Sequence, residues 1–414
     1  MKILRDQRIS DLYYILAVIS YVSTLFVNGM RPGVFGAALM VLVLAELAVR
    51  KELRPKAMAD YIATAFFAYQ ILSVIWLVRG GFPLSVYINE FVSSCFPMIF
   101  YFVGRSAGLR SAKWYRNYLY AMLVLGVLGV AMYVIAPGFY IDWAYRWIYI
   151  SKADAATMRV RMHSVVGSTC LSFLMVAGML AGSYFLGRYD HDGDVPKEKT
   201  AGSQKGGRRD VVFACVTMGA CLLFAIMANQ RSGLVAAALV LVYVNYLIFF
   251  KLDMIPRKYF MYEVIAIAAV FVAVGIVRFD FLLKFWYRII SLPTAISQRS
   301  EQWVAAVNNM YSSWIGNGLG ANGHRAIGIE DAHVIADGGL VKLYCENGVI
   351  GFSLFIYLLI LVLTDGIKNI RSRYVEVGII IVGLLQSIGS NMLAFQICAP
   401  IFWFAVGRCA DTKD

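Results

Sequence analysis

Long apolar runs dominate this sequence and limit what it can fold into. A helix needs about 20 apolar residues to cross a hydrocarbon layer of about 30 Å. Hydrophobic residues make up 60% of the chain and charged residues 15%, whereas soluble domains average about 45–50% and about 25%. We therefore predict an all-α, polytopic membrane protein of about twelve transmembrane helices, with residues 1–414 as one integral membrane domain. The runs are residues 12–29, 33–49, 58–78, 91–104, 117–136, 164–187, 211–228, 233–250, 259–277, 345–364, 375–392 and 395–407.

The distribution of lysine and arginine indicates how these runs thread the membrane. If the N-terminus is cytoplasmic, the segments on the inner side carry 25 of these residues and the loops on the outer side carry 13. Cytoplasmic loops collect lysine and arginine, so we expect both termini to be cytoplasmic. The same rule explains the formal net charge of +13, which therefore does not call for nucleic acid as a partner. Membrane lipids are the expected surroundings.

Three loops are long enough to have a role of their own. Residues 188–210 are polar, glycine-rich and mixed in charge, which is typical of a flexible linker, here cytoplasmic. Residues 137–163 and 278–344 are expected on the periplasmic side. Loops longer than about 12–15 residues are usually functional or disordered, and the second of these two is rich in aromatic residues. We expect it to be a large folded periplasmic loop with short helices, one of them amphipathic over residues 299–314.

Several charges on the expected outer side are not explained by topology. Arg231 lies in a turn of about four residues between two apolar runs. A charge in or beside hydrocarbon costs about 2.5–3.5 kcal/mol, so a polar partner should offset it. Arg159 and Arg161 precede the sixth run, and Arg288 and Arg299 lie in the large loop.

Each arginine has a simpler interpretation when it is taken alone. Arg231 can cap helix carbonyls or extend to lipid headgroups, and Arg159 or Arg161 can bind lipid phosphate without specificity. Together, however, the arginines share one side of the membrane with the acidic and histidine-containing end of the large loop. Guanidinium groups suit bidentate phosphate contacts. The pattern predicts an anion-binding pocket with His333 and Asp337 among its candidate proton acceptors.

Three segments resemble the O-antigen polymerase and ligase superfamily. They are NQRSGLVAAALV, QRSEQWVAAVNNMYSSWIGNGLG and DGGLVKLYCENGVIGFSLF. The second has the pattern R-x-x-x-W followed by G-x-G-x-G, and the third closes the large loop with an acidic residue before G-x-x-G. The resemblance covers residues 159–365, and the first five runs show no detailed match.

The resemblance implies a glycosyltransferase-C-like bundle and a glycosyl transfer at the periplasmic face of a bacterial inner membrane. The donor would be an undecaprenyl-pyrophosphate-linked glycan chain, which a polymerase moves onto the non-reducing-end sugar of another lipid-linked repeat unit. Ligases move the chain to lipid A-core instead, and they typically carry His-Asn where this sequence has Asp337 and Gly338. Polymerases often carry Asp there. The resemblance therefore favours an O-antigen polymerase of lipopolysaccharide biosynthesis, with a ligase as the alternative.

The resemblance also implies roles for the candidate residues. Either Asp337 or His333 is expected to act on the acceptor hydroxyl, as a base or an orienting group. The two residues are four apart, so one helical turn would place them side by side and both stay candidates. Packing of the loop helix is a simpler explanation of the aromatic residues than sugar binding. The residues expected to bind pyrophosphate are Arg231, Arg299 and one of Arg159 and Arg161, with Arg288 in reserve. The candidate sugar contacts are Trp303, Tyr311, Trp314 and His324.

No metal or other cofactor is required in this scheme, because pyrophosphate is a good leaving group and the arginines supply positive charge. Metal-dependent polyprenyl-phosphate glycosyltransferases usually carry acidic residues in the first outside loop, and residues 29–32 contain none. A lipid-linked oligosaccharide flippase is a less favoured alternative, because it would have charges in many spans and no large folded loop. A chain-length-determining co-polymerase is a further candidate partner.

Overall fold

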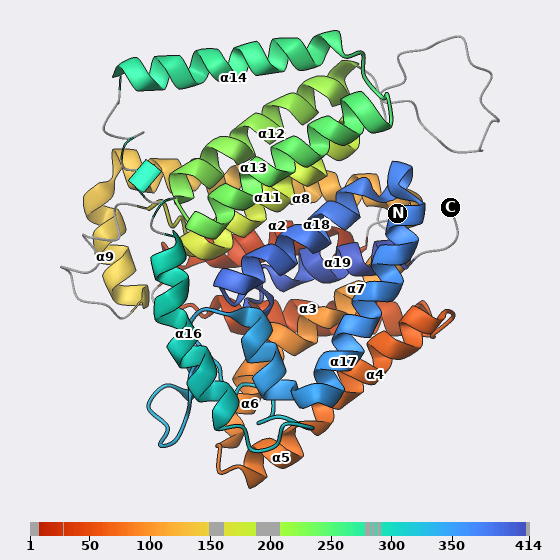
Figure 1. The fold of residues 1–414 in the computed structure, drawn as a ribbon, viewed down its shortest axis with the longest axis vertical. Coiled ribbons are helices and arrows are strands. Elements are labelled where there is room, and N and C mark those ends of the chain that lie inside the picture. The colour runs from red at the N-terminus through yellow and green to blue at the C-terminus, as the bar shows by residue number, and fades with distance from the viewer. Residues whose placement is uncertain are drawn as a thin grey trace.

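The chain folds as a bundle of helices. The computed structural model describes residues 8–27, 29–148, 161–187, 208–277, 283, 286–287, 290 and 292–410. This part of the chain contains helices, turns and irregular segments and no β-strand. Helices α11, α12 and α13 lie side by side across the molecule, and α14 lies above them in the view of Figure 1. The predicted all-α fold is confirmed.

The helices follow the apolar runs along the chain. Helix α17 is interrupted at Gly348, whose φ and ψ of 59° and −169° are not helical. The α-helices are α2 (Ile9–Ser23), α3 (Pro32–Val49), α4 (Met58–Leu72), α5 (Val74–Arg79), α6 (Leu84–Glu90), α7 (Phe100–Arg105), α8 (Ser111–Val130), α9 (Pro137–Ile148), α11 (Ser168–Leu186), α12 (Arg208–Ala228), α13 (Arg231–Asn245), α14 (Lys258–Val277), α16 (Leu292–Asn308), α17 (Gly339–Lys368), α18 (Ile370–Gly389) and α19 (Ala399–Cys409). Short π- and 3₁₀-helical segments are η1 (Phe91–Cys95), η2 (Phe96–Ile99), η3 (Gly108–Arg110), η4 (Ala131–Ile135), η6 (Tyr246–Lys251), η7 (His324–Ala326) and η8 (Met392–Ala394).

Within the described residues, nine helical segments are long and apolar enough to cross a membrane. Helices α2 and α19 overlap the first and last predicted runs, but they are displaced along the chain and shorter, at 15 and 11 residues. The fourth run, predicted as residues 91–104, belongs to a longer segment, Leu84–Arg105. The structure therefore supports a multi-pass helical membrane protein with about nine membrane-crossing helices, and a total of twelve stays a prediction.

The core of the bundle is formed by α11, α18 and α19, which are buried along most of their length. Helices α19 and α7 cross so closely that their backbones touch. A Cβ added to Gly104 would lie 2.0 Å from the carbonyl oxygen of Phe404, and one added to Gly407 would lie 1.8 Å from that of Tyr101. Lipid offers no hydrophobic driving force between membrane helices, so they associate through close van der Waals packing. Small residues such as glycine allow the backbones to approach.

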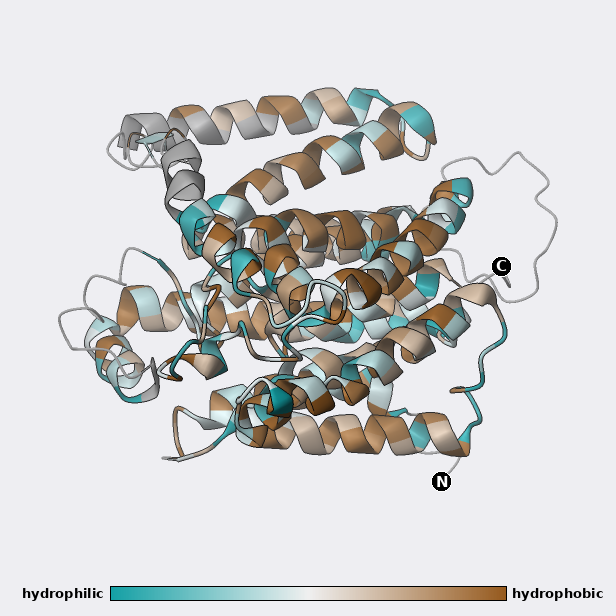
Figure 2. Cartoon of the chain, turned by 60° about the horizontal axis from the view of Figure 1, so that its bottom comes forward, coloured by the Kyte–Doolittle hydropathy of each residue, from teal (hydrophilic) through white to brown (hydrophobic). Residues whose placement is uncertain are grey.

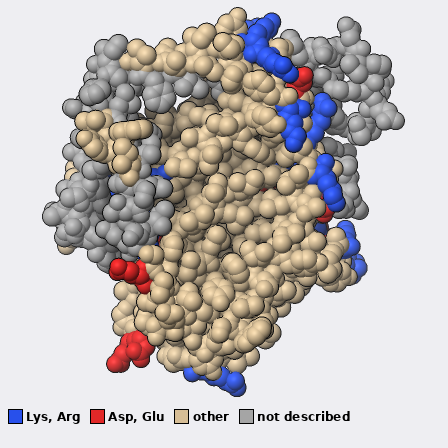
Figure 3. All heavy atoms as spheres, viewed as in Figure 1, with Lys and Arg blue, Asp and Glu red and all other residues tan. Residues whose placement is uncertain are grey.

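The outer surface of the helices is apolar, and charge gathers at their ends. Figure 2 shows hydrophobic residues along the helices and hydrophilic residues in the turns that join them. In Figure 3, Lys and Arg side chains line one edge of the visible face, from the start of α14 to the end of α17. An apolar surface with a basic rim on one side suits a helical bundle in a bilayer.

The described part of the large loop, residues 292–338, is folded onto the bundle. It begins with α16 and continues as an irregular segment that binds α17 and the α4–α5 junction. Asn317 N and Gly318 N donate to the carbonyl oxygens of Cys345 and Glu346, both at 2.9 Å. The helix predicted over residues 299–314 is wrong in its bounds, because α16 starts earlier and ends at Asn308. The chain then turns so that its backbone can bond to α17.

Candidate functional site

Arg231 begins α13 directly after a tight turn from α12. Asn229 adopts a positive φ of 50° and Gln230 is extended, so the chain reverses within two residues. The amide of Gln230 donates to Ser168 Oγ at 2.7 Å and to Thr169 Oγ1 at 3.0 Å. These hydroxyls stand at the start of α11, so the N-termini of α11 and α13 are tied together. Helix N-termini carry partial positive charge, and Arg231 adds a full charge there.

Within the described residues, one N–H group of Arg231 lacks a hydrogen-bond partner. The Nε atom is buried, and the described residues provide no hydrogen-bond acceptor for it. An unsatisfied buried donor of this kind is costly. The cost disappears when an acceptor such as a phosphate oxygen lies beside the guanidinium, so the turn favours the binding of an anion.

Arg299 on α16 and Asp337 just before α17 form an ion pair. Nη2 of Arg299 lies 2.7 Å from Oδ2 of Asp337, and the two side chains are 33% and 40% exposed. Nη1 of Arg299 donates to the carbonyl oxygen of Gly389, at the end of α18, at 3.4 Å. A Cβ added to Gly389 would lie 3.7 Å from Arg299 Nη1 and 3.7 Å from Cβ of Ser232. The ion pair therefore lies beside the start of α13, where Arg231 stands.

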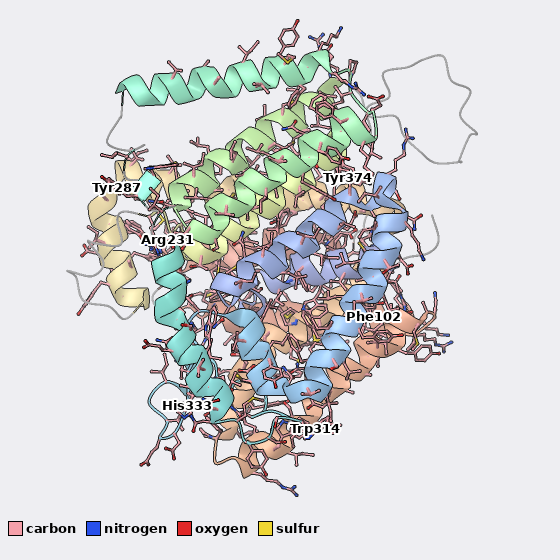
Figure 4. All side chains as sticks on the ribbon, viewed as in Figure 1. Phe102, Arg231, Tyr287, Trp314, His333 and Tyr374 are labelled. Carbon is pink, nitrogen blue, oxygen red and sulfur yellow. The ribbon has the colours of Figure 1, made fainter. Side chains whose placement is uncertain are left out.

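Arg161 belongs to the same group of charges. Burial lowers the pKa of Arg161 from its ordinary value; the charges of Arg231 and Arg299 lower this pKa further, and Asp337 raises it. Figure 4 shows Arg231 beside α16, the helix that carries Arg299. We call Arg161, Arg231, Arg299 and Asp337 the arginine cluster. Its three positive charges and one negative charge come from four separate segments of the chain.

The arginine cluster contains most of the residues predicted to bind an anion. The structure places Arg299 beside the start of α13, where Arg231 lies. Arg161 precedes Met162, whose N–H donates to the carbonyl oxygen of Met227 near the end of α12 at 2.9 Å. The anion-binding role of these residues stays a prediction. The other two predicted arginines, Arg159 and Arg288, lie outside the described residues.

His333 is not one helical turn from Asp337, and that prediction is wrong. Residues 332–335 are not helical, because their backbone groups bond to other segments of the protein. The carbonyl oxygen of His333 accepts from Nδ2 of Asn322 at 2.8 Å, and Ile335 N donates to the carbonyl oxygen of Asn322 at 2.9 Å. Figure 4 shows His333 at the end of α16 that is remote from Arg231.

The predicted sugar contacts divide into two groups. Trp303 contacts the backbone of Asp337, since its Nε1 donates to the carbonyl oxygen at 2.6 Å. Tyr311 and Trp314 are 53% and 67% exposed and follow the end of α16, and Figure 4 shows Trp314 far from Arg231. His324 is exposed at the start of η7. The structure thus ties only Trp303 to the arginine cluster, through a backbone contact that the sequence did not predict.

A second charged group is buried beneath the large loop. Lys342 Nζ lies 2.5 Å from Glu90 Oε1 and 3.3 Å from Glu346 Oε1. Lys342 and Glu346 lie four residues apart on α17, a spacing that suits an ion pair in a helix. Glu90 on α6 is distant in the sequence, and its only signal there is its position just before an apolar run. The backbone N–H of Asn322 also donates to Glu346, at 3.3 Å. This triad joins α6 and α17 to the loop that carries Asp337.

No protein family matches this sequence, and no curated protein matches it. Among the residues that the structure describes, no three His, Cys, Asp or Glu side chains gather in a way that could hold a metal ion.

The arginine cluster itself offers positive charge, two helix N-termini and a carboxylate held by an arginine. Such an arrangement suits an anion with several oxygens, such as a phosphate.

Proposed function

We propose that this chain is an O-antigen polymerase, a metal-independent glycosyltransferase that takes its glycan from undecaprenyl pyrophosphate. The arginine cluster carries this proposal, because charged side chains from four distant segments meet beside the starts of α11 and α13. A pyrophosphate offers enough oxygens for bidentate contacts with more than one guanidinium. The apolar outer faces of the neighbouring helices suit its polyprenyl chain.

The arginine cluster lies at the end of the bundle that we assign to the periplasm. Helix α13 starts at Arg231 and continues into η6, which ends at Lys251. Lys and Arg also line the edge of the bundle near the start of α14 and the end of α17 (Figure 3). The positive-inside rule makes that edge cytoplasmic. Both termini are then cytoplasmic, in the inner membrane of a bacterium.

In the proposed reaction, the bond between the anomeric carbon and the pyrophosphate oxygen breaks. The acceptor sugar hydroxyl forms a new bond to the same carbon and gives its proton to the carboxylate of Asp337. The electron pair of the broken bond leaves with the pyrophosphate, where Arg161, Arg231 and Arg299 stabilise the developing negative charge. Arg299 also orients Asp337, which it contacts at 2.7 Å.

A ligase is the alternative, since it would use the same donor site with lipid A-core as the acceptor. The choice between them rests on the resemblance described above, in which Asp at position 337 is typical of polymerases. A flippase would move the lipid without breaking the glycosidic bond, and an ion pair between Arg299 and Asp337 at the donor site has no part in that task. A chain-length-determining co-polymerase remains a proposed partner.

The test is reconstitution of the purified chain in liposomes that contain lipid-linked single repeat units isolated from a strain lacking the protein. A polymerase produces a ladder of longer lipid-linked chains. Transfer to added lipid A-core without a ladder would identify a ligase, and no new glycosidic bond in either assay would refute the proposal. In cells, loss of a polymerase leaves single-repeat chains, loss of a ligase leaves none, and loss of a flippase traps the lipid-linked unit inside.

A further inference from the structure

We infer that Asn391, which lies in the turn after α18, is a positioning residue for Asp337, and that Trp303 is its second anchor. This rests on the proposed function, because the position of Asp337 affects the rate only if its carboxylate acts on the acceptor. Asn391 is 2% exposed, and we assign it no contact with substrate. Its effect would be transmitted through the backbone that carries Asp337.

Asn391 holds the two residues before Asp337 by their carbonyl groups. Its Nδ2 donates to the carbonyl oxygens of residues 335 and 336, at 2.9 Å and 3.2 Å. In the same turn, the carbonyl oxygen of Ser390 accepts from Gly339 N at 3.3 Å. Asp337 is therefore bracketed on both sides along the chain. The amide donor of Asn391 makes no other hydrogen bond within the described residues.

Trp303 holds Asp337 by its own carbonyl group, at 2.6 Å from Nε1. The next residue, Gly338, has a φ of +131°, and a Cβ added there would lie 2.4 Å from Trp303 Nε1. The carbonyl oxygen of Gly338 accepts from Lys342 N at 2.9 Å, in the first turn of α17. Four successive carbonyl groups, from residue 335 to residue 338, thus accept hydrogen bonds. The side chain of Asp337 projects from a fixed backbone.

The same turn also contacts the partner of Asp337. Gly389, two residues before Asn391, accepts the 3.4 Å hydrogen bond from Arg299 Nη1. The turn at residues 389–391 therefore sets the positions of both members of the ion pair. Reacting groups must be held within about 0.5 Å of their productive geometry, and a misplacement of about 1 Å can cost about 100-fold in rate. An asparagine that fixes this backbone would contribute through kcat.

The experiment compares Asn391→Ala with Asn369→Ala in the full-length protein. Asn369 is a matched control, because its Nδ2 also donates to a carbonyl oxygen, that of Asp365 at 3.1 Å. Asn369 is exposed and lies between α17 and α18, outside the segment that carries Asp337. Hydrogen exchange is measured by mass spectrometry for peptides that cover residues 333–339. Initial rates of chain lengthening are measured against the concentration of the lipid-linked repeat unit, which separates kcat from KM.

For Asn391→Ala we expect faster exchange in residues 333–339 and little change elsewhere. We expect kcat to fall about 10–100-fold, with KM for the donor within about threefold, because Arg161 and Arg231 still bind the pyrophosphate. Trp303→Phe removes one N–H donor and keeps an aromatic side chain, so it should show the same pattern with a smaller fall in kcat. Asn369→Ala should match the wild type in both measurements.

Unchanged hydrogen exchange in Asn391→Ala would show that Asn391 does not hold the backbone around Asp337, whatever the activity. This backbone-holding role is called the clamp below. Faster exchange with normal kcat would refute the positioning role and leave the proposed function intact. A rise in KM at constant kcat would also refute the positioning role, because Asn391 would then serve donor binding. If Asn391→Ala does not fold, Trp303→Phe decides by the same criteria. Failure of the proposed function is distinct, since the wild type would then form no glycosidic bond while the exchange data still test the clamp.

Discussion

Replacing Arg299 by lysine separates the charge of the arginine cluster from its geometry. Lysine keeps the positive charge but ends in a single ammonium group. The planar guanidinium reaches Oδ2 of Asp337 with Nη2, at 2.7 Å, and the carbonyl oxygen of Gly389 with Nη1, at 3.4 Å. A point charge cannot hold both while it contacts a phosphate. The substitution therefore tests whether the fork of donors matters.

The size of the effect follows from the contacts that are lost. In the resting protein the ion pair is one-third or more exposed, so solvent screening limits its contribution to stability to about 1 kcal/mol or less. In the transition state one charge-assisted hydrogen bond is lost, and such a bond contributes about 1.5–3 kcal/mol. Each 1.36 kcal/mol corresponds to about tenfold in rate. We expect kcat/KM to fall about 10–100-fold for Arg299→Lys, with thermal stability close to that of the wild type.

The assay is the initial rate of lengthening of a fluorescent lipid-linked repeat unit in liposomes. Arg325→Lys is the matched control, because Arg325 is exposed in the same loop and outside the cluster. A rate for Arg299→Lys within twofold of the wild type would show that charge alone suffices and would refute the geometric reasoning. Near-normal activity of Arg299→Ala as well would remove the residue from the pyrophosphate site.

Three other changes test separate parts of the account. Arg231→Ala should abolish chain lengthening while the protein is still expressed and inserted, and long chains from a well-expressed variant would rule the residue out as essential. Incubation of the purified enzyme with a chelator should leave its rate unchanged; inhibition that added metal reverses would overturn the metal-independent mechanism. Lys342→Met should lower the thermal unfolding temperature, because breaking a buried ion pair costs about 3–5 kcal/mol. The same change at the exposed Lys251 should have little effect, and equal stability of the two variants would contradict a structural role for the triad.

The positions of the helices could be predicted because hydrocarbon selects apolar runs of a fixed length. The run 33–49 coincides with α3 and the run 211–228 lies within α12. The predictions failed where polar residues continue a helix. Helix α17 starts at Gly339, six residues before the predicted run, because Lys342 is neutralised by Glu90 from a distant segment. Hydropathy along the chain cannot show such a partner.

The candidate site could be predicted in part, for a physical reason. Each arginine lies at the mouth of a span or in the large loop, so their placement on one side follows from topology. Their pairing does not, because the contact of Arg299 with Asp337 depends on how the loop folds. The misplacement of His333 has the same origin. A spacing of four residues fits a helix, but the side chains of Asn322 and Asn391 donate to the carbonyl oxygens of His333 and Ile335, and that segment is not helical. Asn391 is 56 residues from Ile335 in the sequence, and the sequence alone does not show that contact.

The most direct test of the arginine cluster as the donor site is a cryo-EM structure of the protein with undecaprenyl pyrophosphate. The account predicts phosphate density within about 3.5 Å of the guanidinium nitrogens of Arg161, Arg231 and Arg299, with the carboxylate of Asp337 facing the anomeric position. A headgroup bound at another face of the bundle, with these three side chains making no contact to phosphate, would contradict it.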